Sequence, residues 1–143
     1  MPATATAIPT TTPTRVRTVA LLAAGILVAI LVNSVIAIVA LAAGASPDFS
    51  PLLVFVYGPF TLLGFLAACV GWRVVGRRAR RPAALLRVLV PVLTVLSFAP
   101  DAVLAITGFI PGASLTGVVA LGLMHLVVVA VAVPICARLA PVH

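Results

Sequence analysis

Four long apolar stretches dominate the pattern of hydrophobic and polar positions along the chain. Each has about the 20 residues that an α-helix needs, at 1.5 Å per residue, to cross a hydrocarbon core of about 30 Å. The pattern predicts spans over about residues 18–43, 52–72, 84–106 and 115–137. The predicted fold class is therefore all-α: an integral membrane protein built as an antiparallel four-helix transmembrane bundle.

The segments outside the spans have the composition of tails and turns. Residues 1–17 are rich in Thr and Pro and are predicted to be a flexible cytoplasmic tail, followed by the transmembrane domain at 18–138 and a short cytoplasmic tail at 139–143. Residues 44–51 contain the Gly, Pro, Ser and Asp typical of a turn, and the segment around 111–112 is a Pro-Gly turn.

The end of the third span has two interpretations. Pro100 disfavours a helical conformation at the preceding residue, Ala99, which would end the span there. The residues that follow are nevertheless apolar as far as Ile106 and beyond. Asp101 therefore lies either inside the span or in the outer loop.

The first apolar stretch has a second interpretation as well. Arg15 and Arg17 before it and small residues near Ala42 imitate a signal peptide. The apolar part of a signal peptide has about 7–15 residues, and this stretch is far longer. We expect it to be retained as a span.

Composition excludes a water-soluble domain. Of 143 residues, 64% are hydrophobic and 8% charged, and the mean hydropathy is +1.36. A soluble domain carries about a quarter of its residues as Asp, Glu, Lys and Arg. Two acidic residues and nine basic ones cannot coat a globule of this size with charge, and an apolar chain of this kind is not a disordered tail.

The distribution of charge predicts the orientation in the membrane. All nine basic residues are Arg: two precede the first span, six lie between the second span and the first turn of the third, and one follows the fourth. Under the positive-inside rule this makes both termini and the Arg-rich segment cytoplasmic, in a multi-pass protein of the cell membrane. Two interpretations of this segment stay open. One is that it only sets the topology; the other is that it also contacts anionic lipid headgroups through Arg73, Arg77, Arg78, Arg80, Arg81 and Arg87.

A few polar residues inside the spans are the candidates for function. Ionisable and amide groups at membrane depth are costly, so we single out Asn33, Tyr57, Asp101 and His125. Helical rise puts all four in the outer half of the bilayer. We predict that His125 points into the bundle toward Asn33 or Asp101; the plainer interpretation is that His125 and Asn33 only bond neighbouring helices.

Several kinds of chemistry lack the residues they require. With two His and two Cys, no metal-binding cluster is expected, and no cofactor motif or catalytic pair of carboxylates is present. We expect no catalytic residues and no enzyme. Cys69 and Cys136 lie in apolar runs and are expected to be small buried thiols rather than a disulfide framework. An aromatic platform for nucleic acid is also missing beside the Arg-rich segment.

Small residues suggest how the helices pack. Gly64 with Ala68, and Ala67 with Gly71, are spaced four apart, which lets helix backbones approach closely in lipid. We therefore expect a non-enzymatic structural or accessory subunit, whose partners are the lipid bilayer and either a second copy of itself or another membrane protein. The alternative is a small transporter or permeation protein that uses the outer polar layer.

The second half of the chain resembles a known family. Gly71-Trp72 precedes the basic segment, Leu96, Ser97 and Pro100 follow in the third span, and the last span reads MHLVVVAVAVPICAR. Together these resemble an uncharacterised family of small four-span membrane proteins from high-GC Gram-positive bacteria. The resemblance implies the fold but no activity, substrate or cofactor.

Overall fold

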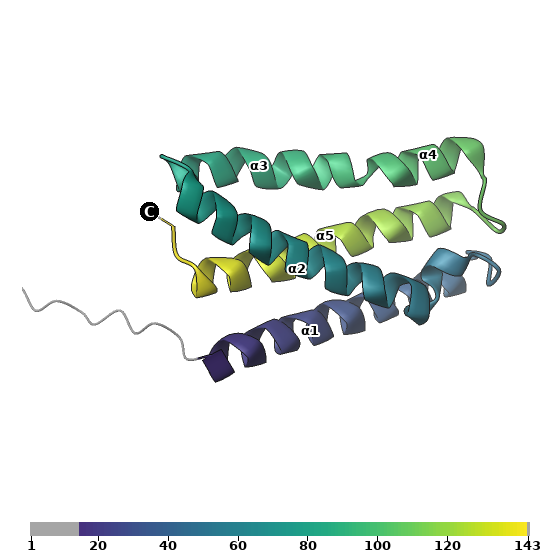
Figure 1. Cartoon of the computed structure of the whole chain (residues 1–143). Helices are drawn as coiled ribbons and strands as arrows, with labels where there is room; N and C mark the ends of the chain where they lie inside the picture. The colour runs from purple at the N-terminus through teal and green to yellow at the C-terminus, as the bar shows by residue number, and fades with distance from the viewer. Residues whose placement is uncertain (1–14, 143) are drawn as a thin grey trace, which may run out of the picture.

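A computed structural model describes residues 15–142 of the chain. Within these residues all regular structure is helical: α1 (Arg15–Ala42), the short 3-10 turn η1 (Ser50–Leu52), α2 (Val54–Arg78), α3 (Pro82–Ser97), α4 (Ala99–Thr107) and α5 (Leu115–Leu139). The long helical segments lie lengthwise beside one another (Figure 1). Four segments are long and apolar enough to cross a membrane, with α3 and α4 counting together as one. The predicted N-terminal tail lies mostly outside the described residues.

Several helices extend beyond the expected ends of the spans, although α1 ends at Ala42 and α2 begins only at Val54. α1 already begins at Arg15, so the last residues of the predicted tail are helical. α2 continues six residues past Trp72 to Arg78, because nothing in this stretch breaks a helix before the extended Ala79. Pro82 then opens α3 at a position where its missing N–H is not needed. Much of the predicted basic loop is therefore helix.

The third span is a broken helix. α3 ends at Ser97, and α4 begins at Ala99 with Pro100 in its first turn, where a proline is tolerated. α4 then runs to Thr107 and ends at Gly108, whose left-handed backbone (φ 60°) closes the helix. Of the two interpretations of this span, the longer one holds. Asp101 consequently lies in the first turn of α4, inside the span.

α5 is the helix around which the others pack. It makes its most extensive contact with α1 and the next with α2, and α4 and η1 also contact it. The buried residues of α1 form a stripe of mostly small side chains at helical spacing: Gly25, Ala29, Asn33, Ala37 and Ala40. A Cβ on Gly25 would clash with Ile135 and lie 2.7 Å from Cζ of Phe65. Close approach of α1, α2 and α5 thus depends on the missing side chain.

The connection before α2 seals one end of this packing. Phe49 is fully buried, and its ring covers Gly117 at the start of α5, where an added Cβ would lie 2.8 Å from Cδ1 of the phenylalanine. Gly112 in the last connection has a positive φ of 74° and lies close to the backbone of Phe49. The two connections therefore fit against each other, which positions the first turns of α2 and α5.

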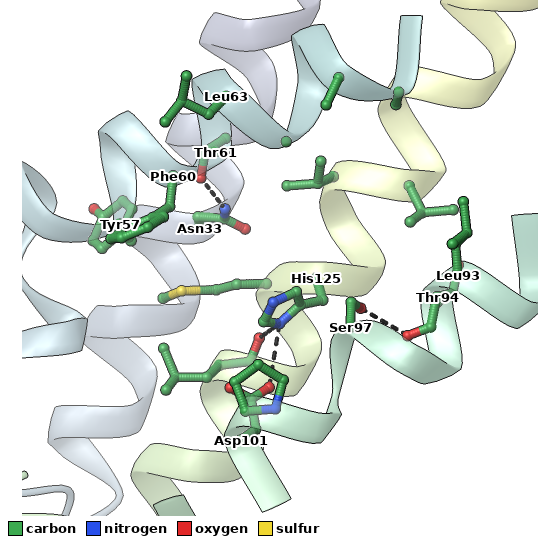
Figure 2. A pocket seen from close by; sticks show the side chains of 18 of the residues that line it. Asn33, Tyr57, Phe60, Thr61, Leu63, Leu93, Thr94, Ser97, Asp101 and His125 are labelled. Atoms are coloured by element: carbon green, nitrogen blue, oxygen red, sulfur yellow. Dashed lines mark hydrogen bonds and ion pairs between the residues drawn. The ribbon is translucent and has the colours of Figure 1, made fainter. Parts of the chain in front are cut away.

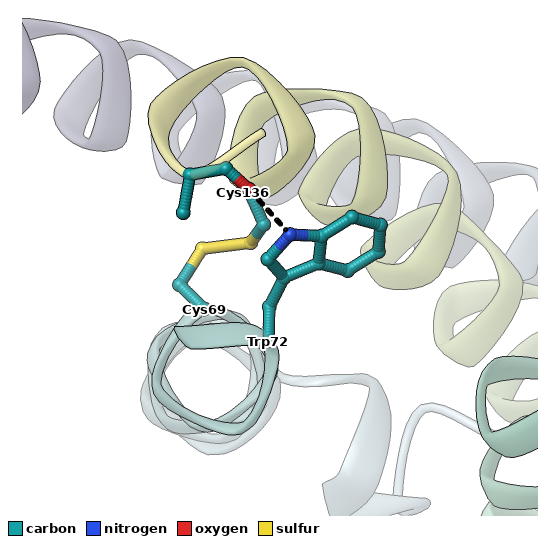
Figure 3. The surroundings of a disulfide bond; sticks show 4 residues. Cys69, Trp72 and Cys136 are labelled. Carbon is teal, nitrogen blue, oxygen red and sulfur yellow. Dashed lines mark hydrogen bonds between the residues drawn. A yellow bond between two sulfur atoms is a disulfide. The ribbon is translucent and has the colours of Figure 1, made fainter. Parts of the chain in front are cut away.

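The two cysteines are joined in a disulfide between α2 and α5. Cys69 and Cys136 have Cα atoms 5.2 Å apart (Figure 3). The indole of Trp72 lies next to the bond, and its Nε1 donates a hydrogen bond of 2.9 Å to the carbonyl of Ala140. The expectation of two buried free thiols was therefore wrong. The reason is spatial: both residues lie on the faces along which α2 and α5 meet, and composition does not reveal which faces meet.

Candidate functional site

A cleft of about 890 Å³ lies along α2, α5 and the broken helix α3–α4. α2 and α3–α4 form its two walls, and α5 lies between them. The α2 wall extends from Val56 to Trp72, which corresponds to about 24 Å at 1.5 Å per residue. Several residues from the middle of the walls are well exposed, among them Phe60 at 71% and Leu93 at 52%. The cleft therefore opens sideways, toward the surroundings of the helices.

Small residues form much of the α2 wall. Gly64, Ala67, Ala68 and Gly71 all line the cleft and all are exposed. Nothing lies within 4 Å of a Cβ built on Gly71, and the nearest atom to one on Gly64 is a methyl of Val128 at 3.7 Å. The spacing predicted a surface for close helix packing, but no helix of the described chain covers this face of α2. The small side chains leave open space instead.

Two hydrogen bonds between α1 and α2 define one polar part of the cleft. Asn33, only 1% exposed, donates from Nδ2 to Oγ1 of Thr61 at 2.9 Å (Figure 2). One turn away, the hydroxyls of Ser34 and Tyr57 are 2.7 Å apart. Hydrogen bonds of this kind hold neighbouring helices together in lipid. Asn33 thus forms an interhelical hydrogen bond, as the plainer interpretation proposed.

The second polar part joins α4 to α5. Nδ1 of His125 is 3.3 Å from Oδ2 of Asp101 and 2.9 Å from the carbonyl oxygen of Leu121 (Figure 2). A carbonyl can only accept, so Nδ1 carries a proton and donates it to Leu121. The ring of Phe98 meets the imidazole edge-on, with centroids 6.0 Å apart. His125 points toward Asp101, which is one of the two neighbours predicted for it.

Two buried acceptor atoms at this site have no hydrogen-bond donor among the described residues. They are Oδ1 of Asn33 and Oδ2 of Asp101. Both residues line the cleft, and Asp101 is only 8% exposed. The contact from His125 at 3.3 Å does not satisfy Oδ2, because the Nδ1 proton is directed to Leu121. A buried acceptor without a donor costs about 1–3 kcal/mol, more for a charged group.

The structure thus brings the four intramembrane candidates to one cleft and leaves the arginines elsewhere. Asn33, Tyr57, Asp101 and His125 all line it, while no arginine does. Arg73, Arg77 and Arg78 are on α2 and Arg87 is on α3, so only Arg80 and Arg81 belong to a connecting segment; all six are exposed. In the described residues no group of three or more His, Cys, Asp and Glu could hold a metal ion.

Sequence reasoning overlooked the partners of the candidates. Ser34 and Thr61 were not among the four candidates, yet each bonds a candidate residue on the neighbouring helix. The available signal was adjacency: Asn33 and Ser34 are consecutive in α1, and Tyr57 and Thr61 are four apart on one face of α2. Two polar pairs with such spacing on neighbouring spans can bond in parallel.

Comparison with known proteins assigns the chain to a family. A family model described as a family of unknown function, DUF6069, matches residues 10–142. The chain belongs to the DUF6069 family. The resemblance to a family of unknown function is thereby confirmed, and four apolar helices fit a small membrane protein. No curated protein and no solved structure matches this DUF6069 chain.

Proposed function

We propose that this DUF6069 protein is a non-enzymatic, multi-pass protein of the cell membrane whose lateral cleft binds an amphiphilic molecule from the bilayer. The cleft is the observation that carries the proposal. Its volume lies within the range of about 300–1,000 Å³ typical of small-molecule sites. It is elongated, it opens sideways, and polar side chains from α1, α2, α3, α4 and α5 line it. A purely structural subunit has no need of such a space.

The proposed setting is an antiparallel four-helix bundle with both termini in the cytoplasm. Its support is the charge distribution: the start of α1, the end of α2, the start of α3 and the end of α5 lie at one end of the molecule (Figure 1), and these helix ends, with the connection between α2 and α3, carry the arginines. Asp48 belongs to a connection at the other end. A reporter fused after Arg138 should read cytoplasmic and one inserted near Asp48 external; the opposite readings would overturn this orientation.

A binding role fits the chemistry of the cleft better than catalysis does. His125 commits its Nδ1 proton to a backbone carbonyl, and Asp101 is the only carboxylate lining the cleft. The cysteines are joined to each other, so neither offers a free thiol. The cleft is thus apolar with a few hydrogen-bonding groups, and this chemistry suits recognition of a ligand rather than bond cleavage.

The test is photolabelling in lipid nanodiscs with alkyl diazirine probes that share one long chain and carry an ammonium, hydroxyl or sulfate head. We expect saturable labelling of residues lining the cleft by at least one probe. Ala67→Phe combined with Ala68→Phe places two phenyl rings on the α2 wall, where they occupy part of the cleft, and should reduce this labelling severalfold. The matched control is Ala23→Phe with Ala24→Phe, two exposed alanines of α1 outside the cleft, which should leave it unchanged. Labelling that is non-saturable for every head would overturn the proposal.

A helix from a partner protein is the second candidate occupant, favoured by the exposed small residues of α2. It corresponds to an accessory subunit that binds a second copy of itself or another membrane protein. The same experiment separates the two. If a helix fills the cleft, purification in mild detergent should retain a stoichiometric partner or dimer, Ala67→Phe with Ala68→Phe should release it, and the probes should not label the cleft.

A further inference from the structure

We infer that the cleft selects amphiphiles whose head is a protonated amine, held by Asp101 and Asn33. This inference rests on the proposed function and specifies its ligand. Asp101 lies on α4 and Asn33 on α1, and both side chains line the same cleft. The structure assigns both side chains the role of hydrogen-bond acceptors for a donor that the ligand supplies.

The hydrogen-bonding inventory of the site calls for a donor. Oδ1 of Asn33 and Oδ2 of Asp101 are buried without a donor in the described chain. The Nδ2 donor of Asn33 is used by Thr61, and the Nδ1 donor of His125 by Leu121. Nδ2 of Asn33 and Nδ1 of His125 thus each already donate one hydrogen bond, while Oδ1 of Asn33 and Oδ2 of Asp101 accept none from the described chain. An ammonium group has three donors and no acceptor, which matches this inventory.

The charge at the site also favours a protonated amine. The chain has two acidic residues, and Asp101 is the one inside a span. No arginine lines the cleft, so the cationic group facing Asp101 from a neighbouring element is His125, when that ring is protonated. A carboxylate surrounded by apolar side chains gains most from a ligand that brings a positive charge. A sulfate or phosphate head would instead meet a like charge.

The remainder of the cleft suits the other end of such a molecule. Tyr57 and Phe60 of α2 and Phe109 line the cleft as well, and aromatic faces attract cations. Farther along α2 and α3 the lining changes to small and aliphatic residues such as Ala68, Leu86 and Leu89. The cleft therefore combines a polar site for a head with an apolar groove for a chain, and the side opening lets the chain enter from lipid.

The experiment compares the three photoprobes by the concentration that half-saturates labelling of the cleft. For the wild-type protein in nanodiscs of neutral lipid, the ammonium probe should saturate at a concentration at least about tenfold below the hydroxyl probe, as expected for charge-assisted hydrogen bonds, with the sulfate probe weakest. Asp101→Asn keeps the shape of the side chain and should bring the ammonium probe close to the hydroxyl probe. The matched control is Asp48→Asn, an exposed acid outside the cleft, which should keep the full preference.

The outcomes separate this inference from the proposed function. Equal half-saturation for ammonium and hydroxyl heads, or a preference that survives in Asp101→Asn, overturns the amine assignment while binding in the cleft stands. Failure of all three probes to saturate overturns both. If Asp101→Asn does not fold, the ranking of the three heads on the wild-type protein still decides the matter. Neutral lipid ensures that anionic headgroups do not set the ranking.

Discussion

Small residues behave in opposite ways on the two sides of this molecule. On α1, Gly25 and Ala29 are buried where α1 meets α5, and Gly25 leaves no room for a Cβ. On α2, Gly71 and Ala68 are exposed and border open space. The residue types and spacing are alike, but one stripe holds helices together and the other lines a cleft. Small-residue spacing therefore marks a face that can be approached closely, without saying by what.

The part formed by α1, α2 and α5 and the part formed by α3 and α4 also differ in the bonds that hold them in place. The α2–α5 contact contains a covalent bond, Cys69–Cys136, while α2 and α3 are walls of a cleft that no bond closes along its length. α4 is tied to α5 through the approach of Asp101 to His125, whose hydrogen bonding is incomplete. A rigid half formed by α1, α2 and α5 thus faces a more weakly attached α3–α4.

Removing the disulfide should have the largest effect on stability. Cys69 and Cys136 are 67 residues apart, and closing a loop of this length stabilises a chain by at most about 4 kcal/mol in the chain-entropy account. Cys69→Ala combined with Cys136→Ala should lower the midpoint of thermal unfolding in detergent by more than any other change discussed here. Trp72→Phe, which removes only the hydrogen bond to Ala140, should cost about 1 kcal/mol. A double variant as stable as the wild type would show that the rigid half is held by packing alone.

Inserting a side chain into each small-residue stripe tests the contrast directly. Gly25→Leu should destabilise the protein by about 1–3 kcal/mol, because the new side chain must displace Phe65 and Ile135. Gly71→Leu makes the same gain in helix propensity and meets nothing within 4 Å, so its unfolding midpoint should stay equal or rise slightly. Thermal unfolding of both variants provides the measurement. Equal losses of stability would contradict the distinction between a packed and an open stripe.

The sequence was sufficient for the helical content and the apolar segments, because both depend on local composition. The hydrophobic pattern predicted four long apolar helices, and four are present. It also singled out Asn33, Tyr57, Asp101 and His125, all of which line the cleft; that they share one depth in the outer half of a bilayer stays a prediction. Facing is a different matter. How the helices rotate against one another decides three findings. Cys69 lies next to Cys136, no atom lies within 4 Å of a Cβ built on Gly71, and Pro100 breaks the span without ending it.

The smallest effect is expected at the hydrogen bond between α1 and α2. Thr61→Val keeps the shape of the side chain but removes the acceptor for Nδ2 of Asn33, leaving a second atom of that buried amide without a partner. The free energy of unfolding should fall by about 1 kcal/mol, since hydrogen bonds between membrane helices contribute about 0.6 kcal/mol on average and a buried orphan donor adds to the loss. Thr107→Val is the matched control, because this exposed hydroxyl bonds only within its own helix, to the carbonyl of Val103, and the change should be neutral.

The Thr61→Val variant also tests the role of Asn33 in the cleft. Asn33 is then free to turn its amide, so saturable labelling by the ammonium probe should weaken in Thr61→Val and persist in Thr107→Val. Loss of stability without any change in labelling would mean that Asn33 only joins the helices and that Asp101 alone recognises the head.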